Sequence, residues 1–213
     1  MSAHTLVIGT GTANTASVLA GLRRVGADPE LTQDPRAVQQ AERVVLPGVG
    51  TFAAARAQLD QQATGQTSSL AQVVQERVRA GRPTLAICLG MQLLFDGSEE
   101  NPEVPGLGLI PGRATRFSET VRVPQLGWNA VEAARGCEIL QSGYAYYANS
   151  YRLVPAAPGW ERATTEHDGP FLAACERGPI VACQFHPELS GDYGMGILER
   201  WLAAAREQEV RPC

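Results

Sequence analysis

The sequence predicts an α/β fold in which a mostly parallel, open sheet is flanked by helices and extended by antiparallel strands. The first observation is that short apolar runs alternate with helical patterns over the first hundred residues, which is typical of a parallel sheet with helices on both faces. The second is that residues 109–181 change to short β-like runs bounded by Gly and Pro. The first half therefore predicts the parallel sheet, and the second half predicts its antiparallel extension.

The individual elements follow from the spacing of apolar residues and from the turn residues between them. Val18, Leu19 and Leu22, for example, lie on one face of a helix. In the first half we expect strands at 5–8, 30–32, 43–46 and 84–88, and helices at 14–25, 52–59 and 70–80. In the second half we expect β-like runs at 114–117, 144–154 and 170–175, a core strand at 180–183 and a closing helix at 193–206.

We expect a single domain over residues 1–213, because this length suits one hydrophobic core. The Gly- and Pro-rich stretch 102–111 is the predicted boundary between two approximate halves, 1–101 and 109–206. The charged tail at 207–213 is expected to fray.

The composition is that of an ordinary globular protein, with 44% hydrophobic and 19% charged residues. The 18 basic and 22 acidic residues give no electrostatic case for binding nucleic acid. No apolar stretch approaches the roughly 18 residues of a membrane span, and the N-terminus lacks the basic and apolar regions of a signal peptide. We therefore expect a cytoplasmic protein that binds neither membranes nor nucleic acid.

Cysteine and histidine are sparse. The three histidines are His4, His167 and His186, so a cysteine that needs a histidine base has few candidates. The cysteines are odd in number, form no Cys-x-x-Cys pair and accompany no histidine cluster, so we expect neither a disulfide framework nor a metal site. The five cysteines are Cys88, Cys137, Cys175, Cys183 and Cys213.

Cys88 ends an apolar β-type run and begins a helical pattern, Thr-Leu-Ala-Ile-Cys-Leu-Gly-Met-Gln at 84–92. A thiol on a sharp strand-to-helix turn has the layout of a nucleophile elbow, and Ala86 and Gly90 are small enough to permit that turn. The first N–H groups of the following helix would favour the thiolate. The alternative interpretation is a buried core cysteine, which is the most frequent fate of a free cysteine.

His186 and Glu188 follow the last predicted strand. Pro187 disfavours the helical region for His186 and so makes it extended, and residues i and i+2 of an extended chain project to the same face. Glu188 can then accept a hydrogen bond from one ring nitrogen of His186 and leave the other free. With Cys88 they would form a catalytic triad; a loop-capping histidine beside a solvated glutamate is the alternative.

Two glycines, Gly48 and Gly50, end the strand at 43–46. They allow backbone N–H groups to approach a ligand closely, and with the N–H of Leu89 they could form an oxyanion hole. Taken in isolation, this motif is more typical of a tight turn with no chemical role.

Three segments carry a resemblance to a known family: Leu-Pro-Gly-Val-Gly-Thr-Phe at 46–52, Cys-Leu-Gly-Met-Gln-Leu-Leu-Phe at 88–95 and Phe-His-Pro-Glu at 185–188. Together they resemble the triad (class I) glutamine amidotransferases. Leu-Gly-Trp-Asn at 126–129 and the aromatic run at 144–151 extend the resemblance over nearly the whole chain, and they favour the glutaminase subunits of imidazole glycerol phosphate synthase. The resemblance implies a flavodoxin-like core and hydrolysis of glutamine to glutamate and ammonia without a cofactor.

The resemblance also implies roles for individual residues. Cys88 would form a glutamyl thioester, His186 would carry protons, and Glu188 would orient His186. The oxyanion hole would use Gly50 and the N–H of Leu89. The head group of glutamine would be held by Gln92, Glu100 and the backbone at Ser150 and Tyr151.

A partner is implied as well: a (β/α)8-barrel cyclase subunit of imidazole glycerol phosphate synthase, in a heterodimer. The cyclase would combine the ammonia with a phosphoribulosyl formimino nucleotide to give imidazole glycerol phosphate and an aminoimidazole ribonucleotide, in histidine biosynthesis. The amidotransferase core uses nearly all the residues, so we expect the barrel of roughly 250 residues to be a separate chain. Trp128, Tyr146 and Tyr147 are candidate interface residues.

Several positions depart from the common family pattern, among them residues 10–13, where the usual start is Asp-Tyr-Gly-x-Gly. Ala86 stands where the elbow usually has glycine, and Gln125 and Asn149 stand where many members have histidine. Leu189 stands where a lysine commonly follows His-Pro-Glu and can pair with an acidic residue of the cyclase. Leu189 therefore predicts a change in the detail of docking.

Two alternatives to this function stay open. One is the glutaminase subunit of another synthase, such as pyridoxal phosphate synthase, in which His-Pro-Glu-Leu also occurs. The other is a non-catalytic regulatory subunit, against which the intact set of Cys88, His186 and Glu188 argues.

Overall fold

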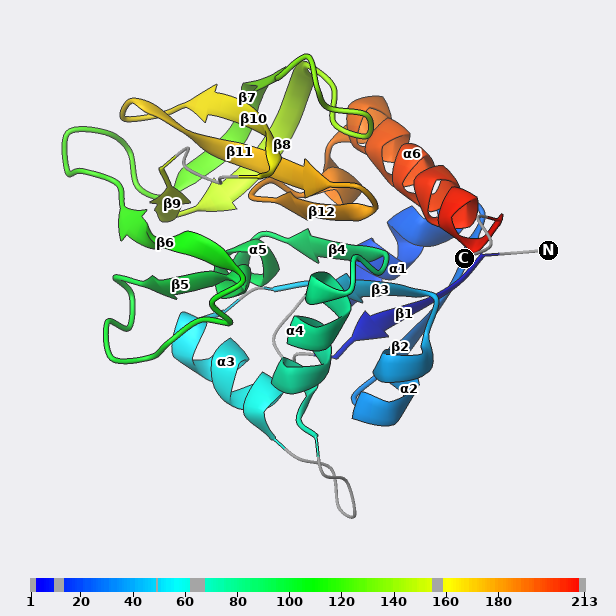
Figure 1. Ribbon diagram of the computed structural model, residues 1–213. Coiled ribbons are helices and arrows are strands. Elements are labelled where there is room, and N and C mark those ends of the chain that lie inside the picture. The colour runs from blue at the N-terminus through cyan, green and yellow to red at the C-terminus, as the bar shows by residue number, and fades with distance from the viewer. Residues whose placement is uncertain (1–2, 10–13, 49, 62–67, 155–158, 211–213) are drawn as a thin grey trace.

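The computed structural model describes residues 3–9, 14–48, 50–61, 68–154 and 159–210, with side chains up to residue 205. Its main sheet has the strand order β2-β1-β3-β4-β12-β11-β10-β7-β8, and a smaller sheet has the order β5-β6-β9 (Figure 1). The strands from β2 to β12 pair in parallel. Those from β12 to β8 pair antiparallel.

The strands and helices have the following bounds. The strands are β1 Ala3–Ile8, β2 Ala27–Thr32, β3 Arg43–Leu46, β4 Thr84–Ile87, β5 Phe95–Ser98, β6 Ile110–Arg116, β7 Gln125–Ala133, β8 Gly143–Asn149, β9 Tyr151–Leu153, β10 Glu161–Glu166, β11 Pro170–Arg177 and β12 Ile180–Cys183. The helices are α1 Thr15–Arg24, α2 Pro35–Gln40, α3 Phe52–Asp60, α4 Leu70–Arg79, α5 Leu89–Leu94 and α6 Gly191–Val210, with a 3-10 turn, η1, at Pro187–Leu189.

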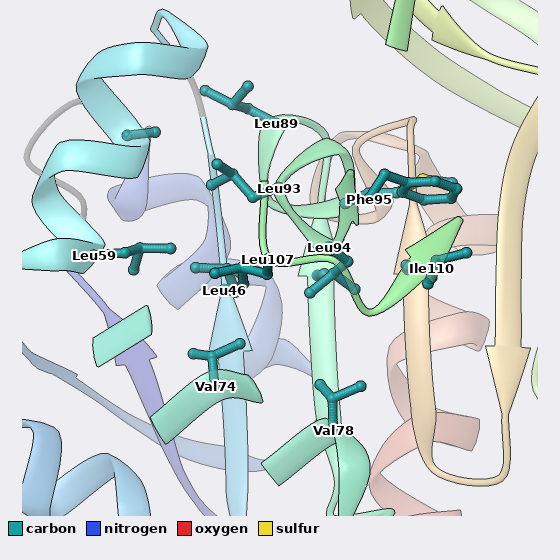
Figure 2. Packing of buried hydrophobic residues seen from close by; sticks show 14 of the residues in the cluster. Leu46, Leu59, Val74, Val78, Leu89, Leu93, Leu94, Phe95, Leu107 and Ile110 are labelled. Carbon is teal, nitrogen blue, oxygen red and sulfur yellow. The ribbon is translucent and has the colours of Figure 1, made fainter. Parts of the chain in front are cut away.

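Alternate residues of the parallel strands pack on opposite faces of the main sheet. On one face, Leu46 of β3 packs with Leu59 of α3 and Val74 of α4, in the cluster that Figure 2 shows. On the other face, Val45 of β3 packs in a second cluster that includes residues of α1 and α6. In Figure 1, α6 accordingly lies on the opposite side of the sheet from α3 and α4. A parallel sheet covered on both faces explains why its strands are apolar throughout.

The predicted α/β class, with a parallel core and an antiparallel extension, is confirmed. Helix α2 was not among the helices predicted from the sequence. Two local signals mark its start: Asp34 accepts a hydrogen bond from the N–H of Arg36 as the N-cap, and Pro35 occupies the first turn. The helix is only six residues long, too short to show a helical period.

The second sheet was also missed. Phe95, which continues the apolar helical pattern after Cys88 in the sequence, instead begins β5 and pairs in parallel with Ile110 of β6. The stretch 102–111 therefore lies in the connection between two paired strands and includes the start of β6. The β-like run at 144–154 is divided between the two sheets, into β8 and β9, at Ser150.

The closing helix is longer than expected. Helix α6 begins at Gly191 and continues to Val210, so it includes the first residues of the predicted tail, 207–210. Cys213 lies outside the described residues. Among the helices that the structure describes, none combines the length and the apolar character needed to cross a membrane.

Candidate active site

The turn between β4 and α5 holds Cys88 in a strained conformation. Its backbone has φ 54° and ψ −112°, on the positive side of φ that residues with a side chain rarely adopt. Such strain costs on the order of 1–3 kcal/mol and persists only where the surroundings enforce it. Here the N–H of Cys88 donates to the carbonyl of Cys183 at 2.7 Å, and Cys88 is the N-cap of α5. The structure thus contains the strand-to-helix elbow that the sequence predicted.

Gly90 is required because two backbone segments meet at the elbow. A β-carbon on Gly90 would overlap the carbonyl oxygen of Leu46, and a β-carbon on Gly48 would lie only 2.4 Å from the backbone nitrogen of Gly90. Ala86, two residues before the thiol, is buried in β4 and packs with the Leu46 cluster, so alanine is accommodated there.

Strand register brings the histidine to the thiol. β4 and β12 pair in parallel with Ile87 opposite Cys183, so the chain beyond β12 leaves the sheet next to Cys88. His186 is extended, with φ −101° and ψ 96°, and its Nδ1 lies 2.9 Å from Oε1 of Glu188. The predicted pairing is therefore present. Its geometry differs from the expected one, because Glu188 lies in the 3-10 turn η1 rather than in an extended chain.

The backbone of His186 is held on both sides. Its N–H donates to the carbonyl of Tyr146 on β8 at 3.0 Å. The hydroxyl of Ser190 donates to the carbonyl of His186 at 2.6 Å and accepts from the N–H of Tyr146 at 2.9 Å. Ser190 thereby ties the histidine loop to β8 and limits the movement of the imidazole.

The environment of His186 favours the imidazolium. Burial by itself disfavours the charged form, but hydrogen bonds to Cys88 and Glu188, together with the charges of both groups, outweigh burial and raise the pKa of His186 well above its ordinary value. The side chains of His186 and Glu188 are 8% and 2% exposed, so bulk water screens these interactions little. A histidine in this environment can hold the proton that an attacking cysteine gives up.

A pocket of about 180 Å³ opens in front of Cys88. It brings together all the residues for which the sequence resemblance implied oxyanion or substrate roles, and it adds Ala148 and Asn149. Its lining residues are Gly50, Cys88, Leu89, Gln92, Glu100, Ala148, Asn149, Ser150 and Tyr151. Glu100 is fixed there because its Oε2 accepts from the N–H of Phe52 at the start of α3, at 2.8 Å.

The expected oxyanion donor is already engaged. The N–H of Leu89 donates to the carbonyl of Gly48 at 3.3 Å, so it is not free to stabilise an anion in the pocket. Gly50 has φ 99°, a conformation that favours glycine. Val49, which lies between Gly48 and Gly50 in the sequence, is outside the described residues.

Three residues of this region carry no role in the sequence analysis. Gln184 is fully buried and lies two residues before His186, so strand alternation alone would have placed both on the face of the thiol. Asn149 lines the pocket, and its Oδ1 is buried without a hydrogen-bond partner among the described atoms. Ser190 had no local signal, because its hydroxyl connects His186 to Tyr146 of the distant strand β8.

Comparison with known proteins places the chain in a family. The model of the family "Glutamine amidotransferase class-I" matches residues 6–204. The imidazole glycerol phosphate synthase subunit HisH of Mycobacterium leprae is 42% identical over 212 residues, which cover 94% of this chain and 98% of that protein. The HisH subunit of a Synechococcus strain is 39% identical over 197 residues, which cover 89% of this chain and 87% of that one.

Two further matches differ in kind. The chloroplastic imidazole glycerol phosphate synthase hisHF of Arabidopsis thaliana is 40% identical over 199 residues, and the match covers 90% of this chain but only 33% of that longer protein. A crystal structure of a glutamine amidotransferase superposes with a TM-score of 0.73, covering 95% of this chain and 98% of the other. At 18% identity, this last match shows the fold alone.

The chain therefore belongs to the class-I glutamine amidotransferases, and both the predicted fold class and the predicted enzyme class are confirmed. Within that class it belongs to the family of the HisH subunits of imidazole glycerol phosphate synthase. The family that Gly-Trp-Asn and Cys-Leu-Gly-Met-Gln favoured is thus the one that the relatives name, rather than pyridoxal phosphate synthase.

Replacing Glu188 by Gln should lower the pH at which His186 titrates. The carboxylate raises the pKa of His186, and a neutral amide removes its charge while keeping a hydrogen-bond acceptor. Nitrogen-15 NMR of the imidazoles would measure this, with the signals of His4 and His167 as internal references. A titration of His186 that does not move in Glu188→Gln would contradict the role assigned to this pair.

Proposed function

We propose that this chain hydrolyses glutamine through a thioester on Cys88 and passes the ammonia to a (β/α)8-barrel cyclase subunit, which makes imidazole glycerol phosphate. The observation that carries the proposal is the position of Cys88, whose thiol lies between the pocket and the His186–Glu188 pair. Hydrolysis of an amide needs a nucleophile, a proton carrier and a site for the substrate, and these three meet at one residue.

In the first half of the reaction, the thiolate of Cys88 attacks the amide carbon of glutamine, a C–S bond forms, and the carbonyl oxygen becomes an oxyanion. The C–N bond then breaks as the imidazolium of His186 gives its proton to the departing nitrogen, which leaves as ammonia. In the second half, His186 takes a proton from water, the hydroxide attacks the thioester, and glutamate leaves as the thiolate of Cys88 is restored. Glu188 keeps the ring of His186 oriented throughout.

The hydrogen bond between Leu89 and Gly48 supports the proposal that the cyclase controls the glutaminase activity of the site. An oxyanion needs the N–H of Leu89, so this bond must break before the first step is fast. A movement of the carbonyl of Gly48 would release the donor. The proposal is that docking of the cyclase, loaded with its nucleotide, stabilises the released state, which couples ammonia production to its use.

The outer face of the β7–β8 hairpin is the proposed docking surface for the cyclase. Leu126 and Trp128 are 56% and 58% exposed, and Trp128 packs edge to face with Tyr146 at a ring distance of 6.1 Å. This apolar face adjoins the active site, because Tyr146 bonds the backbone of His186 and Ala148 lines the pocket. Tyr147, in contrast, is fully buried and points to the inner face, so its selection as an interface residue was wrong.

Leu189 lies beside the histidine loop and is 39% exposed. It contributes an apolar side chain where the family pattern commonly supplies the charge of a lysine. The cyclase of this synthase is therefore proposed to meet Leu189 with an apolar surface rather than with a carboxylate.

Cys88→Ala should abolish glutamate release in the presence of the cyclase and its nucleotide, with a loss of roughly three orders of magnitude or more, as for removal of other catalytic nucleophiles. Cys137→Ala is the matched control, because Cys137 is only partly buried and lies outside the pocket, and it should keep wild-type turnover. Wild-type glutaminase activity in Cys88→Ala would show that the nucleophile is another group.

Without the cyclase, the wild-type chain should release glutamate slowly, because the N–H of Leu89 remains bonded to Gly48. Trp128→Ala should leave this slow rate unchanged but raise the cyclase concentration needed for stimulation by about tenfold or more, as for a central aromatic of an interface. Leu31→Ala, which alters an exposed residue of the distant β2, is the control. Equal wild-type turnover with and without the cyclase would refute the proposed activation of the site by the cyclase.

A further inference from the structure

Gln184 is a fully buried amide in direct contact with the thiol. Its Nε2 lies 3.7 Å from Sγ of Cys88, within hydrogen-bond distance for sulfur. Its Oε1 accepts from Nε2 of Gln92 at 2.9 Å. Gln92, one turn into α5, also donates from Nε2 to the carbonyl of Tyr151 at 3.4 Å. These contacts form a chain that runs from Tyr151 through Gln92 and Gln184 to Cys88.

The direction of this chain is fixed at one end. A backbone carbonyl can only accept, so the carbonyl of Tyr151 requires the NH2 group of Gln92. Because the same NH2 group also faces Gln184, Gln184 must present its oxygen there. The NH2 group of Gln184 is then the part that faces Sγ. Rotating either amide by half a turn would set two acceptors or two donors against each other.

We infer that Gln184 is a catalytic residue of this site, a neutral N–H donor to Cys88 whose orientation is set by Tyr151 through Gln92. The inference rests on the proposed role of Cys88 as the nucleophile. A hydrogen bond to the charged form of a group favours that form, so a fixed donor at Sγ supports the thiolate over the thiol. It also limits the rotation of the Cys88 side chain.

The chain also connects the nucleophile to the substrate pocket. Gln92 and Tyr151 both line that pocket, whereas Gln184 lies behind it. With its NH2 group engaged twice, Gln92 has its oxygen left for a ligand. A glutamine that donates an N–H to this oxygen would polarise the amide of Gln92 and strengthen its bond to Gln184, and through it the bond to Cys88.

The test is the rate at which iodoacetamide alkylates Cys88 as a function of pH, followed by mass spectrometry of the peptide that contains it. Gln184→Met keeps the length of the side chain and removes the donor. The midpoint of the rate profile should move up by about one pH unit, the size expected for loss of a hydrogen bond to a charged acceptor. An unchanged midpoint in a folded Gln184→Met variant would overturn the inference.

Two further variants separate this effect from general damage to the core. Gln184→Glu keeps an acceptor for Gln92 and places an oxygen against Sγ, so its midpoint should move up further than that of Gln184→Met. Thr5→Val removes a buried hydrogen bond to the carbonyl of Ala3 on β1, and its midpoint should stay at the wild-type value. An equal shift in Thr5→Val, or none in Gln184→Glu, would overturn the inference.

One measurement uses the wild-type protein and therefore does not depend on whether a variant folds. In protein labelled with nitrogen-15 glutamine, alkylation of Cys88 should shift the side-chain amide signal of Gln184, because its acceptor is lost. An unmoved signal would refute the contact. None of these measurements uses glutamine turnover or the cyclase. They can therefore disprove the Gln184–Cys88 hydrogen bond without affecting the proposed function. Conversely, the Cys88→Ala assay can disprove the function without affecting the hydrogen bond.

Discussion

The parallel pairing of β4 with β12 is the interaction on which the whole site depends. These strands are separated by almost a hundred residues, yet they lie side by side, and the N–H of Cys88 extends their pairing by one hydrogen bond to Cys183. That bond sets where β4 stops and the elbow begins. It also places the chain after β12, with Gln184 and His186, next to the thiol.

The surrounding core enforces the strained backbone that this arrangement needs. Helices cover both faces of the parallel strands, and the elbow cannot relax because Gly48, Gly90 and the carbonyl of Leu46 are already in contact there. A packed interior resists small displacements, so the positive φ of Cys88 is a property of the whole fold rather than of one turn. Function here follows from a backbone conformation that only tight packing maintains.

The sequence could predict the parts of the site that arise from local order. Cys88 at a strand end, the small residues around it, and the restriction that Pro187 places on His186 are all effects within a few residues. Long-range pairings were not predictable in this way. Phe95 continues a helical pattern in the sequence, and only its pairing with Ile110 shows that it starts a strand.

The features of the site that were not predicted also depend on contacts between distant segments. Tyr146 and Tyr147 are adjacent residues of the same type, and which of them is buried depends on the face that β8 presents to the core. The bond from Leu89 to Gly48 joins the start of α5 to the turn after β3, and Gln184 is oriented by partners from α5 and β9. Such contacts depend on strand register, which apolar spacing does not specify between distant segments.

The role proposed for Cys88 requires a covalent bond between its sulfur and the γ-carbonyl carbon of glutamine. This bond can be trapped by acid quenching of the enzyme during turnover of radiolabelled glutamine, with the cyclase and its nucleotide present. We expect label on the peptide that contains Cys88, stable in acid and released by hydroxylamine as a thioester is. Turnover with no protein-bound label, or label on a peptide without Cys88, would show that the reaction does not pass through a Cys88 thioester.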